Sequence, residues 1–488
     1  LPDGVDPMDV RYNLIQWVHR STRGWSYGSS VSDPRTGEII KGHVSLGSLR
    51  VRQDYLIAVG LLSPYQNEDV PDEMKELALA RLRQLSAHEV GHTIGLAHNY
   101  SASMDGRASV MDYPHPKVDV EDGAIVLDDA YDDKIGAWDK VSITYGYQDF
   151  PEGTEEGSAL NAILNKAYQE DGLSFISDQD ARPQGSAHPR AHLWDNGDNA
   201  ATELSKVMNI RKIAIDNFSE NNVPIGQPMA TLEESLAPIY FFHRYQVEAA
   251  TKLVGGLDYT YAIRGDGQVP TEMVSPELQQ QALSAVLETI DPTELTLPES
   301  LIKIIPPRPI GYRRGRETIK TRTGVTFDPV APAETAANMT LSLLLRPERA
   351  SRLVEFHARD ASQPSLDAVL SAVIGSTFKS DPGTGLQAEV RRAVNNIALL
   401  NMMQLASDDR ANVQARAITT RQLDTLGKWL KTTSAATKSK EEQAHLIFAM
   451  EQIEHFKENP EAFELKEALS PPDGSPIGMD LEYCSYYE

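Results

Sequence analysis

The sequence predicts an α+β protein with a mixed sheet-and-helix part followed by a long, mainly helical part. Short segments rich in β-branched and aromatic residues, bounded by turn residues, are concentrated ahead of residue 153. Apolar residues at helical spacing dominate the rest. The 488 residues are too many for one ordinary core, and 41% of them are hydrophobic. We therefore predict domains at 1–153 and 154–488, with 305–310 as a candidate further boundary.

Periodicity and turn residues define the elements of the first part. In 9–21, four apolar residues recur at helical spacing, and in 118–127 two alternating segments flank an Asp-Gly turn, which is typical of a hairpin. The expected order is helix 9–21, strands 25–31 and 38–46, helices 49–62 and 72–94, hairpin 118–127 and helix 128–145.

The second part is expected to be built from helices joined by loops. Its periodicity predicts helices at 155–170, 200–220, 232–253, 276–289, 333–345, 365–374, 387–406, 411–432 and 440–459. The polar segment 177–188 and the proline-rich segment 305–309 are predicted linkers. A short hairpin is expected around the alternating Tyr259, Tyr261 and Ile263.

One stretch in helix 72–94 carries a chemical pattern. His88 and His92 are four residues apart, so their imidazoles share one face of a helix and can bind one Zn²⁺. Gly95 lies where the helix should stop, because glycine readily adopts the left-handed conformation that ends helices. The turn would let His98 return as a third ligand, leaving a fourth position for water, as in catalytic zinc sites. Glu89 can lie beside the metal.

A second motif follows at residues 109–113, Ser-Val-Met-Asp-Tyr. With the three histidines it resembles the metzincin clan of zinc endopeptidases, which carry a methionine turn beneath the metal. Tyr113, two residues after Met111, is similar to the tyrosine that assists the reaction in astacins and serralysins. Asn99, after the third histidine, matches neither of those subfamilies nor the matrixins. The whole chain resembles a bacterial family of zinc-dependent metalloproteases with a long C-terminal helical region.

The resemblance implies a metzincin-like catalytic domain: a mixed twisted sheet, a zinc helix and a backing helix after the methionine turn. It also implies an edge strand that pairs with extended substrate. The segment 39–46 is the candidate, with an ordinary sheet strand as the equal alternative. The implied location is extracytoplasmic, either periplasmic or secreted. Because residues 1–4 are neither an initiator methionine nor a signal peptide, we expect the chain to be a fragment or mature product of a longer protein.

The predicted reaction is peptide-bond hydrolysis by a zinc metalloendopeptidase. Zn²⁺ on His88, His92 and His98 would lower the pKa of its water to near 7, and Glu89 would be the general base. Met111 would form an apolar floor. Tyr113 could bind the resting zinc and then hydrogen-bond the oxyanion; a core tyrosine is the alternative. The competing hypothesis is a catalytically silent binding or scaffold protein that works through its helical region; the intact Glu89 favours the enzyme.

Composition limits the partners. The net charge of −24 argues against non-specific nucleic-acid binding and docking on anionic membranes. No apolar run approaches the ~18 residues of a membrane span, so no membrane insertion is expected. The resemblance to zinc endopeptidases implies a protein or peptide substrate as partner. The oligomeric state is left open. The single cysteine, Cys484, excludes a disulfide within the chain. Residues 195–199 offer either calcium ligands or a solvated turn, and His188 with His192 is a weaker metal candidate than the main motif.

Overall fold

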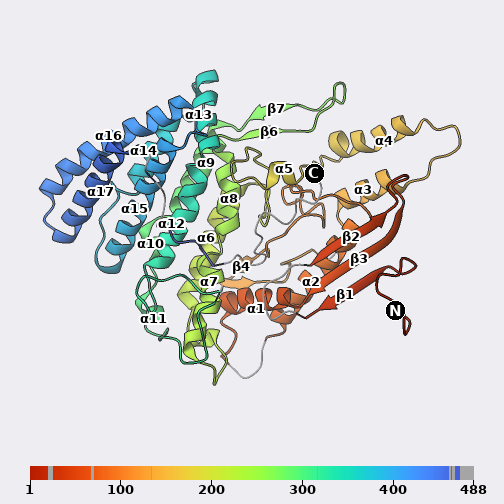
Figure 1. Cartoon of the computed structure of the whole chain (residues 1–488), viewed down its shortest axis with the longest axis horizontal. Helices are drawn as coiled ribbons and strands as arrows, with labels where there is room; N and C mark the ends of the chain where they lie inside the picture. Colours follow the sequence, from red (N-terminus) through yellow and green to blue (C-terminus); the bar gives the residue numbers. More distant parts are fainter. Residues whose placement is uncertain are drawn as a thin grey trace.

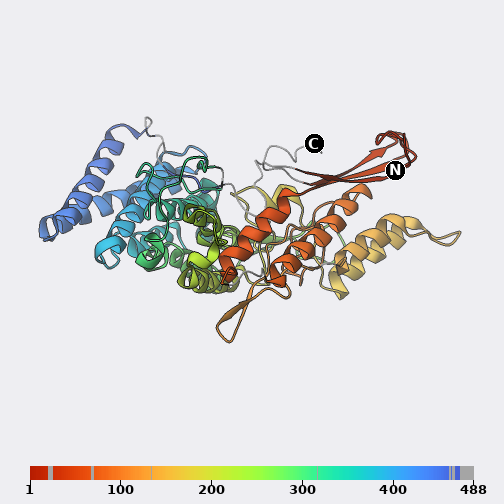
Figure 2. The same ribbon diagram turned by 90° about the horizontal axis from the view of Figure 1, so that it is seen from below.

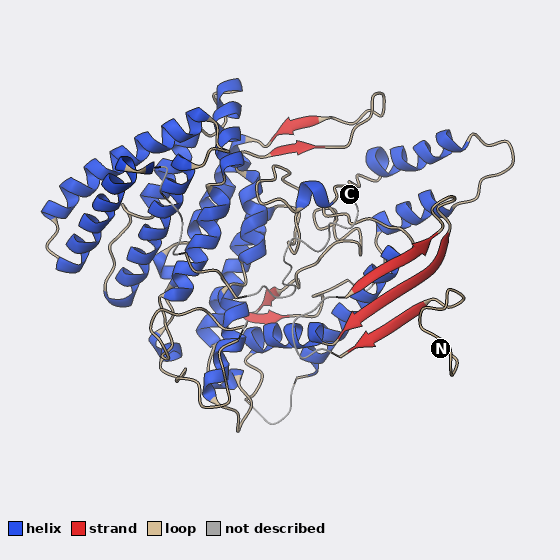
Figure 3. Cartoon of the chain, in the orientation of Figure 1, coloured by secondary structure: helices blue, strands red, loops and turns tan. Residues whose placement is uncertain are grey.

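The protein, seen here in a computed structural model, has a small twisted sheet at one end and a stack of helices at the other (Figures 1 and 2). The structure describes residues 1–19, 26–66, 71–132, 134–315, 317–460, 463 and 468–472. Helices outweigh strands among these residues, and the two are largely segregated (Figure 3). The α+β class predicted from the sequence is therefore confirmed.

The bounds of the elements are as follows. The strands are β1 (Leu14–Val18), β2 (Tyr27–Ser32), β3 (Ile39–Gly47), β4 (Asp119–Glu121), β5 (Ala124–Val126), β6 (Leu257–Tyr259) and β7 (Thr271–Met273). The first helices are α1 (Leu49–Leu62), α2 (Asp72–Thr93), α3 (Ala137–Tyr147), α4 (Glu156–Asn165), the π-helix η1 (Lys166–Glu170), α5 (Asp178–Ala181), α6 (Ala200–Asn217), α7 (Leu232–Tyr240) and α8 (Arg244–Leu253). The later helices are α9 (Pro276–Glu288), α10 (Pro292–Leu295), α11 (Glu299–Ile302), α12 (Ala331–Leu344), α13 (Pro347–Arg359), α14 (Leu366–Ser376), α15 (Gly385–Ser407), α16 (Val413–Ala436) and α17 (Lys440–Glu458), and two short 3₁₀ turns are η2 (Glu220–Asn222) and η3 (Met229–Thr231).

The main sheet has the strand order β1-β3-β2, with β3 parallel to β1 and antiparallel to β2. The predicted helix at 9–21 is wrong, because its central residues form β1; residues 20 and 21 lie outside the described residues. Along β1, half-buried and exposed side chains alternate, which is the period of a strand. Since β1 covers one side of β3, the candidate edge strand 39–46 is also wrong: it is the centre of the sheet.

Helices α1 and α2 lie close to the predicted bounds and connect the sheet with the stack of helices. Helix α2 packs against β2 and β3. Helix α1 packs against α2 on one side and against α7 on the other (Figure 1). Ile57 and Ala58 of α1 belong to the same hydrophobic core as residues of α7, α9, α12 and α15. This core contains residues from both sides of the predicted boundary at 153. The division into 1–153 and 154–488 stays a prediction.

Other predicted elements differ in detail. The hairpin 118–127 is confirmed as β4 and β5, whereas the helix predicted at 128–145 begins only at Ala137, where the Asp139 carboxylate accepts a hydrogen bond from the Gly136 N–H. The helix predicted at 232–253 is two helices, α7 and α8, separated at residues 241–243. Helix α13 is not among the predicted helices, because its sequence is charge-rich and its buried stripe narrow.

Some predictions fall on residues outside the described part of the chain, namely Trp25 at the start of a predicted strand and Cys484. Among the described residues, no helix is both long and apolar enough to cross a bilayer. The predicted linker 177–188 is wrong, because it contains α5, and Asp178 of this helix contacts His98.

Candidate metal centre

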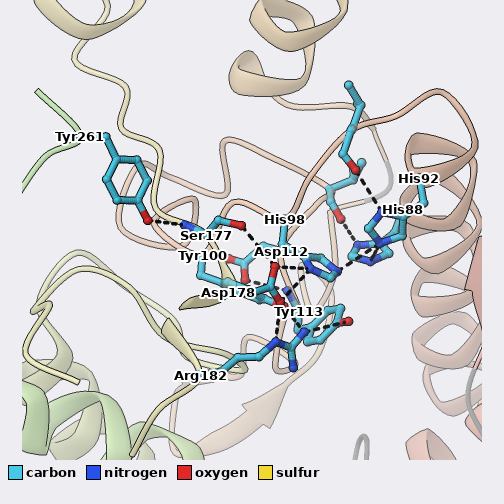
Figure 4. A network of polar contacts seen from close by, with 12 residues as sticks. His88, His92, His98, Tyr100, Asp112, Tyr113, Ser177, Asp178, Arg182 and Tyr261 are labelled. Atoms are coloured by element: carbon cyan, nitrogen blue, oxygen red, sulfur yellow. Dashed lines mark hydrogen bonds and ion pairs between the residues drawn. The ribbon is translucent and has the colours of Figure 1, made fainter. Parts of the chain in front are cut away.

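Three histidines converge at the end of α2 (Figure 4). His88 and His92 lie one turn apart in the last part of the helix, as their spacing predicts. The helix ends at Thr93, and Gly95 follows with a φ of +85°, in the left-handed region that glycine adopts without strain. The reversed chain brings His98 back, so that its Nε2 lies 3.1 Å from Nε2 of His92.

Each of the three imidazoles is held by a hydrogen bond at Nδ1. The acceptors are the backbone oxygen of Val110 for His88 at 2.6 Å, that of Leu96 for His92 at 3.0 Å, and the Asp178 carboxylate for His98 at 2.9 Å. An imidazole that donates from Nδ1 keeps the lone pair of Nε2 for a metal. The contacts therefore turn all three Nε2 atoms toward a common point.

The arrangement fits zinc in both distance and protonation. The Nε2 atom of His92 is 3.1 Å from that of His88 and 3.1 Å from that of His98. With Zn–N bonds of about 2.0–2.1 Å, two ligands of a tetrahedral zinc are roughly 3.3 Å apart. Burial, followed by the neighbouring histidines, lowers the pKa of His88 well below its usual value and that of His92 to about 4. Neutral imidazoles, which zinc requires, are thus favoured.

The methionine turn, residues 109–113, lies under the histidines and is held from below by α3. The Asp139 carboxylate accepts hydrogen bonds from the Ser109 hydroxyl at 2.6 Å and from the Val110 N–H at 2.9 Å. The Met111 side chain lies against Gly91 of α2, where a Cβ would approach its sulfur to 2.3 Å. The turn thereby orients His88 through the Val110 carbonyl and closes the floor of the site.

Glu89 lies beside the histidines, with its side chain buried. The N–H of Gly28 in β2 donates a hydrogen bond to its carboxylate. Burial raises the pKa of Glu89 to about 8, against the opposing effects of the Arg81 guanidinium and the Gly28 N–H. A carboxyl with a raised pKa next to a metal-type site is a candidate for proton transfer.

Tyr113 stands at the other side of the histidines. Its ring centre is 4.9 Å from that of His98 and 5.3 Å from that of His88, and it stacks on Trp194 at 5.5 Å. The phenol oxygen accepts a hydrogen bond from the Arg182 guanidinium at 3.4 Å (Figure 4). The structure therefore brings Tyr113 to the site, in contact with two histidine rings.

Helix α5 and the residue directly after it, Arg182, supply two side chains that the sequence did not single out. Asp178 binds His98 and forms an ion pair with Arg182, and Arg182 also donates to the Tyr100 hydroxyl at 2.6 Å. Burial acts to raise the pKa of Asp178, but the His98 hydrogen bond and the Arg182 charge hold it well below its usual value. The sequence did carry one signal for these residues, an acidic and a basic residue at i,i+4 spacing. It could not show that Asp178 contacts His98, because the two residues are 80 positions apart.

The remaining candidates do not form a metal site. Among the described residues, the three histidines are the one group of His, Cys, Asp and Glu side chains gathered closely enough for a metal. His188 instead contacts the backbone oxygen of Tyr259 at 2.8 Å. The predicted solvated turn at 195–199 is partly wrong, because Asp195 and Asn196 are buried, and Asn199 caps α6.

The geometry defines a three-histidine metal centre with a neighbouring carboxylate, the class of site found in zinc hydrolases. A family model described as Met-zincin matches residues 71–385, well over half of the chain, and the protein belongs to this family. Membership confirms the metzincin-clan zinc metalloprotease expected from the motifs, with zinc as its cofactor. Searches of curated proteins and of solved structures found no match.

Proposed function

We propose that the protein is a zinc-dependent endopeptidase in which His88, His92 and His98 hold the metal and Glu89 is the general base. One observation carries the proposal: three Nε2 atoms point to one place, each ring fixed at Nδ1, beside a buried carboxylate. Family membership supports the protease class, and the arrangement of these side chains supports the assignment of roles.

Zinc bound there would supply Lewis-acid chemistry, polarising the scissile carbonyl and making water more acidic, and its charge would favour the ionised form of Glu89. Glu89 would take a proton from the attacking water and return it to the leaving amine. The Gly28 N–H fixes one side of the carboxylate, so it accepts the proton in a defined orientation. Its buried position limits exchange of that proton with solvent.

Tyr113 is proposed as the donor to the oxyanion. Its ring lies against those of His98 and Trp194, so it belongs to the wall of the centre. The Arg182 guanidinium donates to the phenol oxygen, and a hydrogen bond accepted by a hydroxyl polarises it as a donor. A donor aimed at the oxyanion is typically worth about 3 kcal/mol of transition-state stabilisation.

The main sheet with α2 and α3 is proposed as the metzincin-like catalytic part. Within the described residues, β2 has a partner on one side only, and its Gly28 touches Glu89. An extended peptide added to the free side of β2 would lie next to the general base and gain main-chain hydrogen bonds. We therefore propose β2, in place of residues 39–46, as the substrate-binding strand. The extracytoplasmic location implied by the resemblance is proposed with it.

The test is a peptide-library cleavage assay with wild-type protein, chelator-treated protein and the variant Glu89→Ala. We expect the chelator to abolish cleavage and the variant to retain zinc while losing about 10²- to 10⁴-fold in rate, the usual contribution of general base catalysis. Zinc content measured on the same samples is the control. Near wild-type cleavage by Glu89→Ala at full zinc content would refute the role of Glu89.

A further inference from the structure

Helix α5 forms one wall of the metal centre, although it is only four residues long and lies far from α2 in the sequence. We propose that Asp178 of α5 is a positioning residue for the metal ligand His98, and that the β6–β7 hairpin keeps it in place by binding Asp180. The inference deepens the proposed function, and it relies on that function only for the identity of the metal centre.

The contact between Asp178 and His98 is of the kind that tunes a metal ligand. Both carboxylate oxygens lie within reach of the His98 Nδ1, at 2.9 and 3.1 Å. His88 and His92 donate to backbone oxygens, so His98 is the ligand with a charged partner. A carboxylate behind a ligand histidine fixes the tautomer, restricts ring rotation and increases the basicity of Nε2.

Arg182 keeps this carboxylate charged and correctly placed. Its Nε pairs with Asp178, four residues earlier in the chain, and its Nη2 donates to the hydroxyls of Tyr100 and Tyr113. Its guanidinium also lies 5.4 Å and 5.3 Å from the centres of these two rings. Through α5, His98 and the proposed oxyanion donor Tyr113 therefore share one support.

The β6–β7 hairpin binds α5 through Asp180, whereas His98 and Arg182 contact Asp178. Tyr259 of β6 and Tyr261, two residues on, both donate their hydroxyls to the Asp180 carboxylate, one to each oxygen. The Tyr261 oxygen also accepts the Ser177 N–H at 3.3 Å (Figure 4). Asp178 and Asp180 thus face different partners, and a movement of Asp180 must carry Asp178 with it.

Apolar packing does not replace these hydroxyl contacts. The hairpin and residues 172–176 line an open cavity of about 390 Å³, and the edge-to-face contact of Phe175 with Tyr261 at 6.1 Å covers only part of their boundary. Lys252 of α8 provides a further tie, because its ammonium donates to the backbone oxygen of Ala181 at 2.6 Å. Since Lys252 would remain, removing both tyrosine hydroxyls should loosen α5 without releasing it.

The experiment measures zinc affinity by competition with a chromogenic chelator, using the full chain. Asp178→Ala should weaken zinc binding by about 10- to 100-fold, the usual effect of losing the partner of a ligand histidine. Asp178→Asn keeps the size and one acceptor oxygen but loses the charge, so its affinity should lie between those of Asp178→Ala and wild type. Tyr259→Phe combined with Tyr261→Phe should weaken zinc binding by about 3- to 10-fold. The loss is this small because only part of the free energy of the two lost hydrogen bonds is transmitted through α5 to His98.

Tyr168→Phe is the matched control, since its ring lines the same cavity and stacks on Trp138 at 5.8 Å. It should leave zinc affinity unchanged. The visible spectrum of the Co²⁺-loaded protein gives a second measurement: Asp178→Ala should shift it, because His98 is no longer fixed. A Co²⁺ spectrum that stays unchanged in a variant whose melting temperature and zinc affinity both fall would indicate a purely structural role and overturn the proposal.

Two other results would overturn parts of the inference. Wild-type zinc affinity in both Asp178 variants would exclude Asp178 as a positioning residue. Equal affinity in the double tyrosine variant and in Tyr168→Phe would exclude the hairpin as its support. Because affinity is measured without substrate, a wild-type protein that binds zinc but cleaves no peptide would refute the proposed function alone.

Discussion

Asp139 holds the methionine turn, and its removal should cost stability and zinc binding together. The carboxylate is 1% exposed and accepts hydrogen bonds from Ser109, Val110 and Gly136 at 2.6, 2.9 and 2.6 Å. Hydrogen bonds to charged groups contribute about 1.5–3 kcal/mol each and are not additive, so we expect Asp139→Ala to destabilise by on the order of 4 kcal/mol. The measurement is urea unfolding followed by tryptophan fluorescence.

Zinc affinity should fall in the same variant, by about tenfold, because the Val110 carbonyl that orients His88 loses its anchor. The matched control is Asp216→Ala on α6, whose side chain is 59% exposed and pairs with the equally exposed Lys212. This variant should unfold at the wild-type urea concentration. A loss below about 1 kcal/mol in Asp139→Ala would refute the reasoning, since a buried three-fold acceptor should cost more.

Three further predictions concern the metal, the tyrosine and the helical region. His92→Ala should lose the single tightly bound zinc found by elemental analysis of the wild type; unchanged zinc content would contradict the ligand assignment. Tyr113→Phe keeps the ring and its packing, so kcat and kcat/KM should fall together, by on the order of 10²-fold, with zinc content and stability retained. An unchanged kcat would make Tyr113 a packing residue. Limited proteolysis should not rapidly release the region after Gly153; a fully active fragment ending there would argue against packing.

The zinc helix could be predicted because everything it needs is local. The spacing of His88 and His92 fixes their common face, and Gly95 fixes where the helix ends. The third ligand, His98, follows within six residues of His92, so no long-range contact is required to place it. Tyr113 was also singled out, because the methionine turn is a short motif and Tyr113 stands two residues after Met111, as in astacins and serralysins.

Strand β1 was mistaken for a helix because short apolar segments fit both periods. Leu14 and Val18 are four apart, as on a helix, yet they are also on the same face of a strand with Gln16 between them. The parallel pairing with β3 decided the outcome, and that pairing joins residues about 30 apart. The same error made residues 39–46 look like an edge strand.

Asp178 and Arg182 were missed for a related reason. Their segment is polar, with glycine and proline close behind, and such composition normally indicates a linker. The contacts that place it against the metal centre are with residues distant in the sequence: His98 and Tyr100 on one side, Tyr261 on the other. Composition indicates whether a segment would form a helix or strand by itself. The conformation of this segment depends instead on contacts with residues distant in the sequence.

The wide separation of these parts in the sequence has a consequence for biosynthesis. Asp178 leaves the ribosome 80 residues after His98, and Tyr261 follows Asp180 by a further 81. At roughly 5–20 residues per second, the histidines emerge on the order of 10–30 s before the hairpin that supports their wall. If α5 and the hairpin hold the centre as proposed, an unfinished chain carries the zinc ligands without a complete catalytic site. The order of translation would then spare the emerging protein from its own proteolysis.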